Sequence, residues 1–282
     1  MPELPEVETV RRGLERHLLG RTVLRAEVRR PDLRGPLPPN MAEDLTGRRF
    51  VALERRAKYL VIRLDDGKVW LVHLGMTGRF SLSPTDPGEP QKHDHVLLWL
   101  DDGGHAAFND ARRFGSMDLF PGEELKGHRS LRSLGPEPLS PDLSPESLAV
   151  VLEGKKTPLK SALLDQRVIA GLGNIYVCEI LHRAGLSPRR AAHTIVGKGG
   201  RPTPRVERIV EETQAVLSEA IEAGGSTLKD FSGVDGALGY FPHSFRVYGR
   251  EGEPCPSKGC QKTIERIVQS GRSTFFCPSC QR

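Results

Sequence analysis

The sequence predicts an α+β fold, with an N-terminal helix and a β-sandwich followed by a helical domain and a C-terminal metal-binding β-hairpin. Apolar residues recur at helical spacing at the N-terminus and again between residues 145 and 223. Between residues 22 and 120 the pattern instead indicates short strands divided by turn signals. Four of the five cysteines lie from residue 255 onward. The 282 residues suffice for about two domains at ~100–200 residues each.

The first twenty residues predict an amphipathic helix that begins close to the chain's start. Val7, Val10, Leu14 and Leu18 fall on one helical face, Pro5 suits the first helical position and Gly20 suits the end. If Met1 is removed, Pro2 presents a free secondary amine with the Glu3 carboxylate beside it. An amine nucleophile next to an acid/base group is a catalytic pairing, so Pro2 and Glu3 are candidate catalytic residues.

Short strands are expected at residues 48–53, 59–64, 69–74, 95–100 and 106–109. Asp66-Gly67 and Asp102-Gly103 are typical of hairpin turns. Several closely spaced strands favour a β-sandwich. Pro-rich residues 83–92 predict a loop, and residues 135–145 predict a linker. We therefore expect a catalytic domain at 1–134, a helical domain at 146–240 and a hairpin domain at 241–282.

Helices are expected at 145–153, 158–169, 174–184 and 204–223, with a tight turn between the second and third. At that turn Gly171 and Gly173 permit close backbone approach, and Asn174 can cap the following helix. Free amides at the helix start favour an anion, and Lys155, Lys156 and Lys160 lie just upstream. An ordinary corner between packed helices is the alternative. Gly-rich residues 224–240 are expected to be mobile.

The cysteine spacing predicts a structural zinc site. Cys255 and Cys260 are separated by four residues, Cys277 and Cys280 by two, and a hairpin pattern lies between the pairs. Four thiolates around one zinc leave no position for water, which argues against catalytic zinc. A disulfide or a chance spacing is the alternative. Arg272 falls at or near the hairpin tip, where it could reach a phosphate or remain a solvated turn residue. Cys178, inside a helical pattern, is expected to be a packing residue.

The charge balance favours a polyanionic partner. Lys and Arg total 41 against 36 for Asp and Glu, and the pI is near 9.0. We find neither a basic, apolar leader nor an apolar run of ~18 residues, so we expect a cytoplasmic protein with no membrane contact.

Taken together, these features resemble the bacterial formamidopyrimidine-DNA glycosylase family over nearly the whole chain. The matching motifs are Pro-Glu-Leu-Pro-Glu-Val-Glu at residues 2–8, Lys58-Tyr59-Leu60, His73-Leu74-Gly75-Met76-Thr77-Gly78, Lys92-His93-Asp94-His95, Arg112-Arg113-Phe114-Gly115, residues 171–176, residues 227–231 and the cysteine hairpin. So many motifs in the same order make coincidence a poor explanation.

The resemblance implies a β-sandwich with an N-terminal helix, a helix–two-turns–helix domain and a zinc hairpin, with DNA in the cleft between the two domains. It implies a bifunctional DNA glycosylase and abasic-site lyase that removes oxidised purines, such as 8-oxoguanine and formamidopyrimidines, from duplex DNA. The chemistry would use base flipping, a Schiff base with Pro2 and β,δ-elimination. One structural zinc ion and no organic cofactor are expected, in a monomer associated with the nucleoid.

The family's residue roles carry over by motif position. Pro2 matches the nucleophile, Glu3 the acid/base residue and Glu6 a carboxylate of the active-site network. Lysines near the damaged nucleotide match Lys58 and Lys160. The side chains that replace the extruded base match Met76, Arg112 and Phe114, and His93 falls in a DNA-binding motif. Asn174 and Arg272 match residues that contact DNA phosphates, and the four cysteines named above match the zinc ligands. Residues 229–240 match the loop over the flipped base.

The sequence differs from the family pattern at one point, and two alternative functions remain open. Family members commonly have two residues in the first cysteine knuckle, whereas this chain has four, so we expect a longer knuckle that still holds zinc. Endonuclease VIII, a sister enzyme for oxidised pyrimidines, is the nearest rival, but the N-terminal motif and residues 112–114 favour the purine enzyme. A non-catalytic zinc protein that binds damaged DNA is the other rival, although Glu3 is present.

Overall fold

The structure, a computed structural model, describes residues 1–226 and 245–282. The motif at 227–231 and the loop expected at 229–240 lie outside the described residues. The chain divides into two compact units, each described separately. The first contains residues 1–132 and 223–226, and the second contains residues 133–222 and 245–282.

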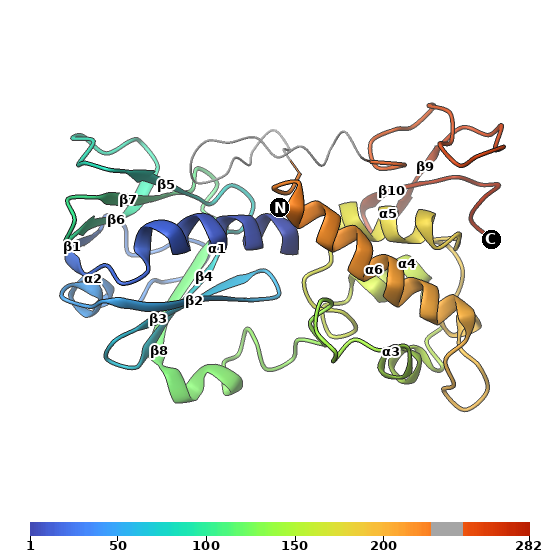
Figure 1. Cartoon of the computed structure of the whole chain (residues 1–282), viewed down its shortest axis with the longest axis horizontal. Coiled ribbons are helices and arrows are strands. Elements are labelled where there is room, and N and C mark those ends of the chain that lie inside the picture. Colours follow the sequence, from blue (N-terminus) through green and yellow to red (C-terminus); the bar gives the residue numbers. More distant parts are fainter. Residues whose placement is uncertain (227–244) are drawn as a thin grey trace. The chain divides into compact units, whose positions relative to one another are not determined.

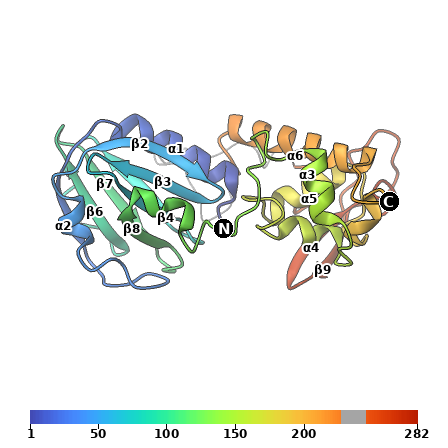
Figure 2. The same cartoon turned by 90° about the horizontal axis from the view of Figure 1, so that it is seen from below.

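Two four-stranded antiparallel sheets make up most of the first unit (Figure 1). One sheet has the order β1 (Val23–Val28), β6 (Asp94–Leu100), β7 (His105–Asn109), β5 (Arg79–Ser83). The other has the order β2 (Phe50–Arg56), β3 (Tyr59–Leu64), β4 (Lys68–His73), β8 (Ser116–Pro121), and Figure 2 shows β2 and β3 side by side in it. Two short helices, α2 (Met41–Leu45) and η1 (Gly122–Gly127), also belong to this unit.

The N-terminal helix α1 (Leu4–Leu18) packs on β2. Its predicted apolar face, Val7, Val10, Leu14 and Leu18, is buried in one core with side chains from both sheets. Across the sandwich the Trp70 ring on β4 meets the Phe80 ring on β5 at 6.0 Å between centroids. The core therefore fixes where α1 begins, and with it the position of the chain's first residues.

Helices dominate the second unit: α3 (Pro145–Leu152), α4 (Leu159–Leu164), α5 (Asn174–Arg183), η2 (Ala192–Ile195) and α6 (Pro204–Glu222). The helix expected at 158–169 ends at Leu164, because Asp165 Oδ1 accepts the Arg167 N–H at 3.0 Å and turns the backbone away. The residues expected as a linker belong to this unit, where the Gly135 N–H donates to the Gln166 carbonyl at 2.8 Å.

The C-terminal hairpin joins β9 (Glu265–Gln269) to β10 (Arg272–Phe276). Its two turn residues, Ser270 and Gly271, have φ angles of 48° and 71°. Positive φ at both positions is the conformation of a type I′ turn, and Arg272 follows it directly at the start of β10. In the part of the chain that the structure describes, no helix is long and apolar enough to cross a bilayer.

Candidate active site and metal centre

The chain's first residues form a desolvated acidic site at the start of α1. Pro2 is buried, and Glu3 and Glu6 are only 3% and 2% exposed. The Glu3 N–H donates to Glu6 Oε2 at 2.8 Å, and the two residues form a reciprocal capping box. The sequence predicted Pro5 as the first helical residue, but α1 begins at Leu4, so Pro5 is the second. Met1 is exposed, and its removal would leave the Pro2 nitrogen as a free secondary amine.

Glu6 also binds Ser226, the last residue of the first unit that the structure describes. Its Oε1 accepts the Ser226 N–H at 2.8 Å and the Ser226 hydroxyl at 2.7 Å. Gly225, with φ +79°, passes so close that a Cβ there would lie 3.3 Å from the Glu6 side chain. One carboxylate thus connects Pro2–Glu3 to the residues just before position 227.

Lys58 lies in the two-residue turn between β2 and β3, and its side chain is only 6% exposed. Ala57, the other turn residue, has a φ of 53°, a conformation that non-glycine residues rarely adopt. The Lys58 charge acts on His73 of β4: burial lowers the pKa of His73 to about 4, with further contributions from Lys58 and Arg34. A neutral His73 accepts the Gly75 N–H on Nδ1 at 3.0 Å, at the start of the Met76 turn.

We predict that His73 makes this protein sensitive to acid. Between pH 6.5 and 4 the unfolded chain binds a proton at His73 and the folded chain does not, so stability present above pH 6.5 is lost as pH falls. This loss should reach about 3 kcal/mol. A His73→Asn variant keeps an acceptor for Gly75 but does not titrate. Urea unfolding across this pH range should show a shallower pH slope for the variant; parallel slopes would contradict the assignment.

Met76, Arg112 and Phe114 come from two loops that are locked together. A Cβ on Gly75 would lie 2.2 Å from the Phe114 carbonyl carbon, so only glycine allows this approach. The fully buried Asp110 joins the loops: its Oδ1 accepts the Thr77 hydroxyl at 2.5 Å and its Oδ2 the Gly115 N–H at 2.8 Å.

The two locked loops expose the side chains of Arg112 and Phe114 to solvent. Phe114 is 46% exposed, and the Arg112 guanidinium lies 4.9 Å from the centre of its ring. Met76 is half-buried. An exposed aromatic ring on a rigid support is the form expected of a wedge that enters a base stack.

His93 lines an open hollow of about 510 Å³ in the first unit. The side chains around it are mainly basic: Arg29, Arg30, Lys92, His93, Asp94, His95, Ala111 and Arg113. Four guanidinium or ammonium groups against one carboxylate make this hollow suited to an anion such as a DNA phosphate.

In the second unit, Lys160 and Asn174 converge on the hairpin next to Arg272. Lys160 Nζ donates to the Ser273 carbonyl at 3.0 Å and to Thr274 Oγ1 at 2.6 Å, and Asn174 Nδ2 donates to the same carbonyl at 2.9 Å. The capping prediction for Asn174 is wrong, because Gly173 is the N-cap of α5 and the Asn174 amide is used in this tertiary contact. Arg272 itself is exposed.

The turn between α4 and α5 is held by Gln166. Its side-chain amide donates to the carbonyls of Leu164 and Leu172, at 3.0 and 2.8 Å, and its Oε1 accepts the Gly171 N–H at 2.9 Å. Gly171, with φ 85°, allows the chain to turn into α5. The arrangement fixes the start of α5, where backbone N–H groups favour an anion.

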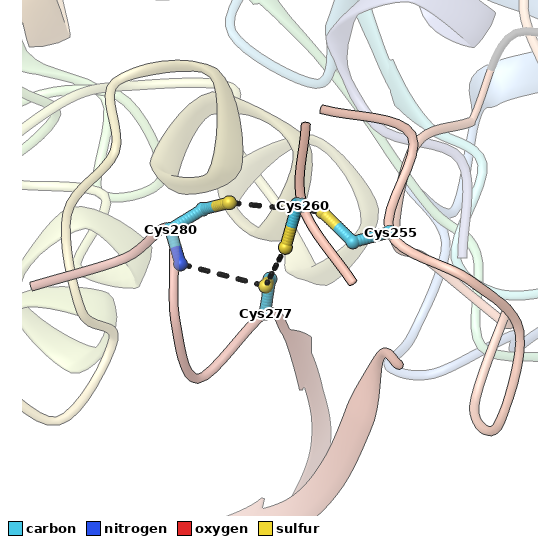
Figure 3. Close-up of side chains that lie close together, drawn as sticks. All are labelled: Cys255, Cys260, Cys277 and Cys280. Atoms are coloured by element: carbon cyan, nitrogen blue, oxygen red, sulfur yellow. Dashed lines mark hydrogen bonds between the residues drawn. The ribbon is translucent and has the colours of Figure 1, made fainter. Parts of the chain in front are cut away.

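The four C-terminal cysteines converge as the spacing predicted (Figure 3). Their sulfur atoms lie within 4.8 Å of one another, with Cys255 to Cys280 at 3.8 Å and Cys260 to Cys277 at 3.6 Å. Four sulfurs at ~2.3 Å from a tetrahedral zinc would lie about 3.8 Å apart, so these residues fit one zinc ion. Burial raises the pKa of the Cys280 thiol to about 12, and neighbouring thiols add to the effect. Zinc binding must therefore displace protons.

We predict that only the clustered thiols hold the metal. A Cys277→Ser variant should contain far less than one zinc per chain, whereas Cys178→Ser should keep a full equivalent, since Cys178 is buried on α5 and is not in the cluster. Because structural zinc contributes ~10–16 kcal/mol to such modules, the Cys277 variant should also lose the hairpin. Native mass spectrometry and amide exchange at residues 265–276 would measure both. Full zinc occupancy in the Cys277 variant would refute this ligand set.

Several supporting residues could not be found from the sequence. Asp110 and Gln166 join loops, and the buried carboxylate of Glu179 accepts the N–H groups of residues 246, 247 and 248 at 2.8, 3.0 and 2.8 Å. Asp110 lies two residues before the motif at 112–115 and Gln166 five residues before the motif at 171–176, and no pattern in the sequence indicates either contact. Glu179 has its partners 67 to 69 residues away.

Family models and curated relatives agree on the chain's classification. Residues 1–117 match the formamidopyrimidine-DNA glycosylase N-terminal domain, 134–232 the H2TH domain of the same enzymes, and 252–282 a zinc finger found in FPG and IleRS. A formamidopyrimidine-DNA glycosylase from Beijerinckia indica is 58% identical over 288 residues, which cover all of both chains.

Solved structures agree as well. MutM (Fpg) from Thermus thermophilus is 40% identical, with a TM-score of 0.86 over 99% of this chain and 98% of that one. A Lactococcus lactis Fpg mutant bound to DNA containing Fapy-dG is 31% identical, with a TM-score of 0.89 over the full length of both chains. The zinc-finger match and the cysteine cluster together identify a one-zinc structural centre. This chain belongs to the formamidopyrimidine-DNA glycosylase family and is an enzyme, a DNA glycosylase with abasic-site lyase activity.

Proposed function

We propose that this glycosylase removes oxidised purines, including 8-oxoguanine and formamidopyrimidines, from duplex DNA and then cuts the strand on both sides of the abasic sugar. The observation that carries the proposal is the buried group of Pro2, Glu3 and Glu6 at the start of α1. It combines an amine, once Met1 is removed, with two carboxylates shielded from water.

In the first step, the neutral Pro2 nitrogen attacks the anomeric carbon of the damaged nucleotide. α-Amines titrate at about pH 7.7–8.0, so a useful fraction is neutral in physiological conditions. The bond from the sugar to the base breaks, and the base leaves with the electron pair. The Pro2 nitrogen loses its proton as the new bond forms, and the departing base takes up a proton. Glu3 donates its proton to the ring oxygen, and the sugar opens to an iminium with Pro2. Glu6, held by Ser226 and by the Glu3 N–H, positions Glu3.

The iminium then acts as an electron sink. Proline's nitrogen is secondary, so its iminium is a fixed cation that cannot lose a proton from nitrogen. The adjacent sugar proton becomes acidic and leaves, the 3′ phosphate departs, and a second elimination expels the 5′ phosphate. Hydrolysis releases Pro2 and leaves a one-nucleotide gap with phosphate ends. Lys58 and Lys160 are the lysines assigned to the neighbourhood of the damaged nucleotide.

This chemistry requires an extruded nucleotide, because a stacked base shields its sugar. Flipping costs a few kcal/mol, and side chains that fill the gap recover part of it. Phe114 and Met76 are assigned to that gap, and Arg112 to the orphaned base, which we take to be cytosine. The locked loops support this role, since a flexible wedge would itself have to be ordered.

Phosphate contacts are assigned to Asn174 and Arg272 in the second unit, and to His93 and Lys58 in the first. We predict that Arg272→Ala reduces the log-log salt slope of DNA binding by ~0.9, the effect of one phosphate contact. Arg21→Ala, which removes a charge paired with Asp102 at 3.1 Å, should leave the slope unchanged. Titrations of an abasic-analogue duplex from 50 to 200 mM salt would decide; equal slopes for Arg272→Ala and wild type would contradict the assignment.

A base-release assay with borohydride tests the function as a whole. Duplexes that carry 8-oxoguanine, a formamidopyrimidine or thymine glycol opposite cytosine or adenine should be compared under single-turnover conditions. We expect faster excision of both purine lesions than of thymine glycol, with a covalent adduct trapped in each productive case. Faster excision of thymine glycol would instead support the pyrimidine specificity of the sister enzyme, and base release without a trapped adduct would refute the Pro2 mechanism.

A further inference from the structure

The last turn of α5 carries a buried histidine that faces the metal cluster. His182 is only 4% exposed, and its Nε2 lies 3.6 Å from Cys255 Sγ and 3.5 Å from Ser257 Oγ. Neither DNA binding nor the chemistry at Pro2 uses this side chain. Its two partners belong to the first cysteine knuckle, which in this chain has four residues between its cysteines.

The first cysteine of each knuckle receives a hydrogen bond from a different source, although the backbone of Lys262 also hydrogen-bonds Cys260 in the longer knuckle. In the shorter knuckle, the backbone N–H of Cys280 donates to Cys277 Sγ at 3.4 Å, so that donor is part of the knuckle itself. In the longer knuckle, the Cys260 N–H donates to the Ser257 carbonyl at 3.0 Å. The donor that faces Cys255 comes from α5, as His182 Nε2.

The direction of that contact follows from the chemistry of a metal thiolate. A cysteine bound to zinc has lost its proton and can only accept a hydrogen bond. An imidazole lone pair directed at the sulfur would be repelled, so Nε2 must carry the hydrogen. Nδ1 is then an acceptor, and among the described residues it has no hydrogen-bond partner. Ligand residues of metal sites commonly depend on such outer donors for orientation.

α5 already contacts this part of the chain at two other points. Near its start, Asn174 binds the Ser273 carbonyl of β10, and in its middle Glu179 accepts three N–H groups from residues 246–248. A contact from His182 would add a third point, on the knuckle itself. The side of the cluster that holds Cys255 would then be fixed by a helix.

We propose that His182 is a positioning residue of the zinc site, whose Nε2–H donates to the Cys255 thiolate and holds the lengthened first knuckle against α5. The histidine is not a ligand, since the four cysteines complete a tetrahedral set. It slows the loss of zinc by stabilising charge on the thiolate and by restraining residues 256–259.

The rate of zinc release to a chromophoric chelator tests this role without any activity measurement. His182→Phe keeps most of the volume and removes the donor, whereas His182→Gln places an amide N–H near the Nε2 position. We expect the Phe variant to release zinc ~10-fold faster or more, and the Gln variant to stay within ~3-fold of wild type. His193→Phe is the matched control, because His193 is exposed in the same unit and lies outside the cluster.

Two measurements keep the proposal falsifiable if the Phe variant folds poorly. In wild-type zinc-loaded protein, nitrogen-15 chemical shifts should place the His182 proton on Nε2; a proton on Nδ1 would overturn the proposal. Cobalt substitution should give a four-thiolate spectrum that is the same in wild type and His182→Gln, whereas a nitrogen-ligated spectrum in wild type would make His182 a ligand and overturn it. Equal zinc release from the Phe variant and wild type would also overturn it.

Discussion

An uncleaved N-terminus is expected to abolish both covalent trapping and base excision. A glutamine inserted between Met1 and Pro2 prevents removal of Met1, adds no side-chain amine, and leaves the Pro2 nitrogen in a peptide bond, where it has no nucleophilic lone pair. Because no other group is assigned as nucleophile, we expect no borohydride-trapped adduct and at least a ~10³-fold slower release of 8-oxoguanine. Native Pro2 is buried beside Glu3, so the remaining α-amine, on Met1 and now two residues before Pro2, should fail to reach the sugar.

The controls separate loss of the amine from loss of fold or DNA binding. Intact mass spectrometry must confirm the N-terminus of each preparation. The blocked enzyme should bind a duplex with a tetrahydrofuran abasic analogue with near-normal affinity, since the loops that carry Phe114 and Arg272 are unchanged. Pro2→Gly is not a suitable test, because glycine also offers an α-amine. Undiminished trapping by a verified blocked protein would eliminate Pro2 as the nucleophile.

Local sequence signals were sufficient where the physical cause is itself local. The apolar stripe of α1 is buried as predicted, and the glycines of the Asp66-Gly67 and Asp102-Gly103 turns adopt φ angles of 83° and 85°. The four cysteines converge because the intervening hairpin brings its ends together, which their spacing already indicated. These features depend on neighbours a few residues away.

Contacts between distant segments account for the errors and omissions. Asn174 was expected to cap its helix, but its amide binds Ser273, 99 residues later. Nothing in the helical pattern around His182 distinguishes this residue, and its partner, the Cys255 sulfur, lies 73 residues away. Asp110 reaches back 33 residues to Thr77 to lock two loops. No periodicity or spacing rule encodes such pairs, because each depends on how the helices, strands and loops are packed.

Glu3→Gln should slow base release by ~10²–10⁴-fold, the usual contribution of a positioned general acid. The substitution is nearly isosteric, and its side-chain carbonyl can still face the Glu6 N–H in the capping box. The free energy of unfolding should therefore change little, whereas Glu3→Ala, which loses the cap, should cost about 1 kcal/mol. Glu15→Gln, on the exposed side of the same helix, is the matched control and should retain full activity.

A preformed abasic site distinguishes the two roles that Glu3 could have. The base has already left such a substrate, and its sugar opens spontaneously to an aldehyde, so formation of the iminium needs no acid for base departure. If Glu3 protonates the ring oxygen, Glu3→Gln should lose far more of its rate on 8-oxoguanine DNA than on abasic DNA in single-turnover trapping. An equal loss on both substrates would contradict protonation of the ring oxygen, because it would place the role of Glu3 in a step that the two reactions share, such as attack by the Pro2 amine or formation of the iminium.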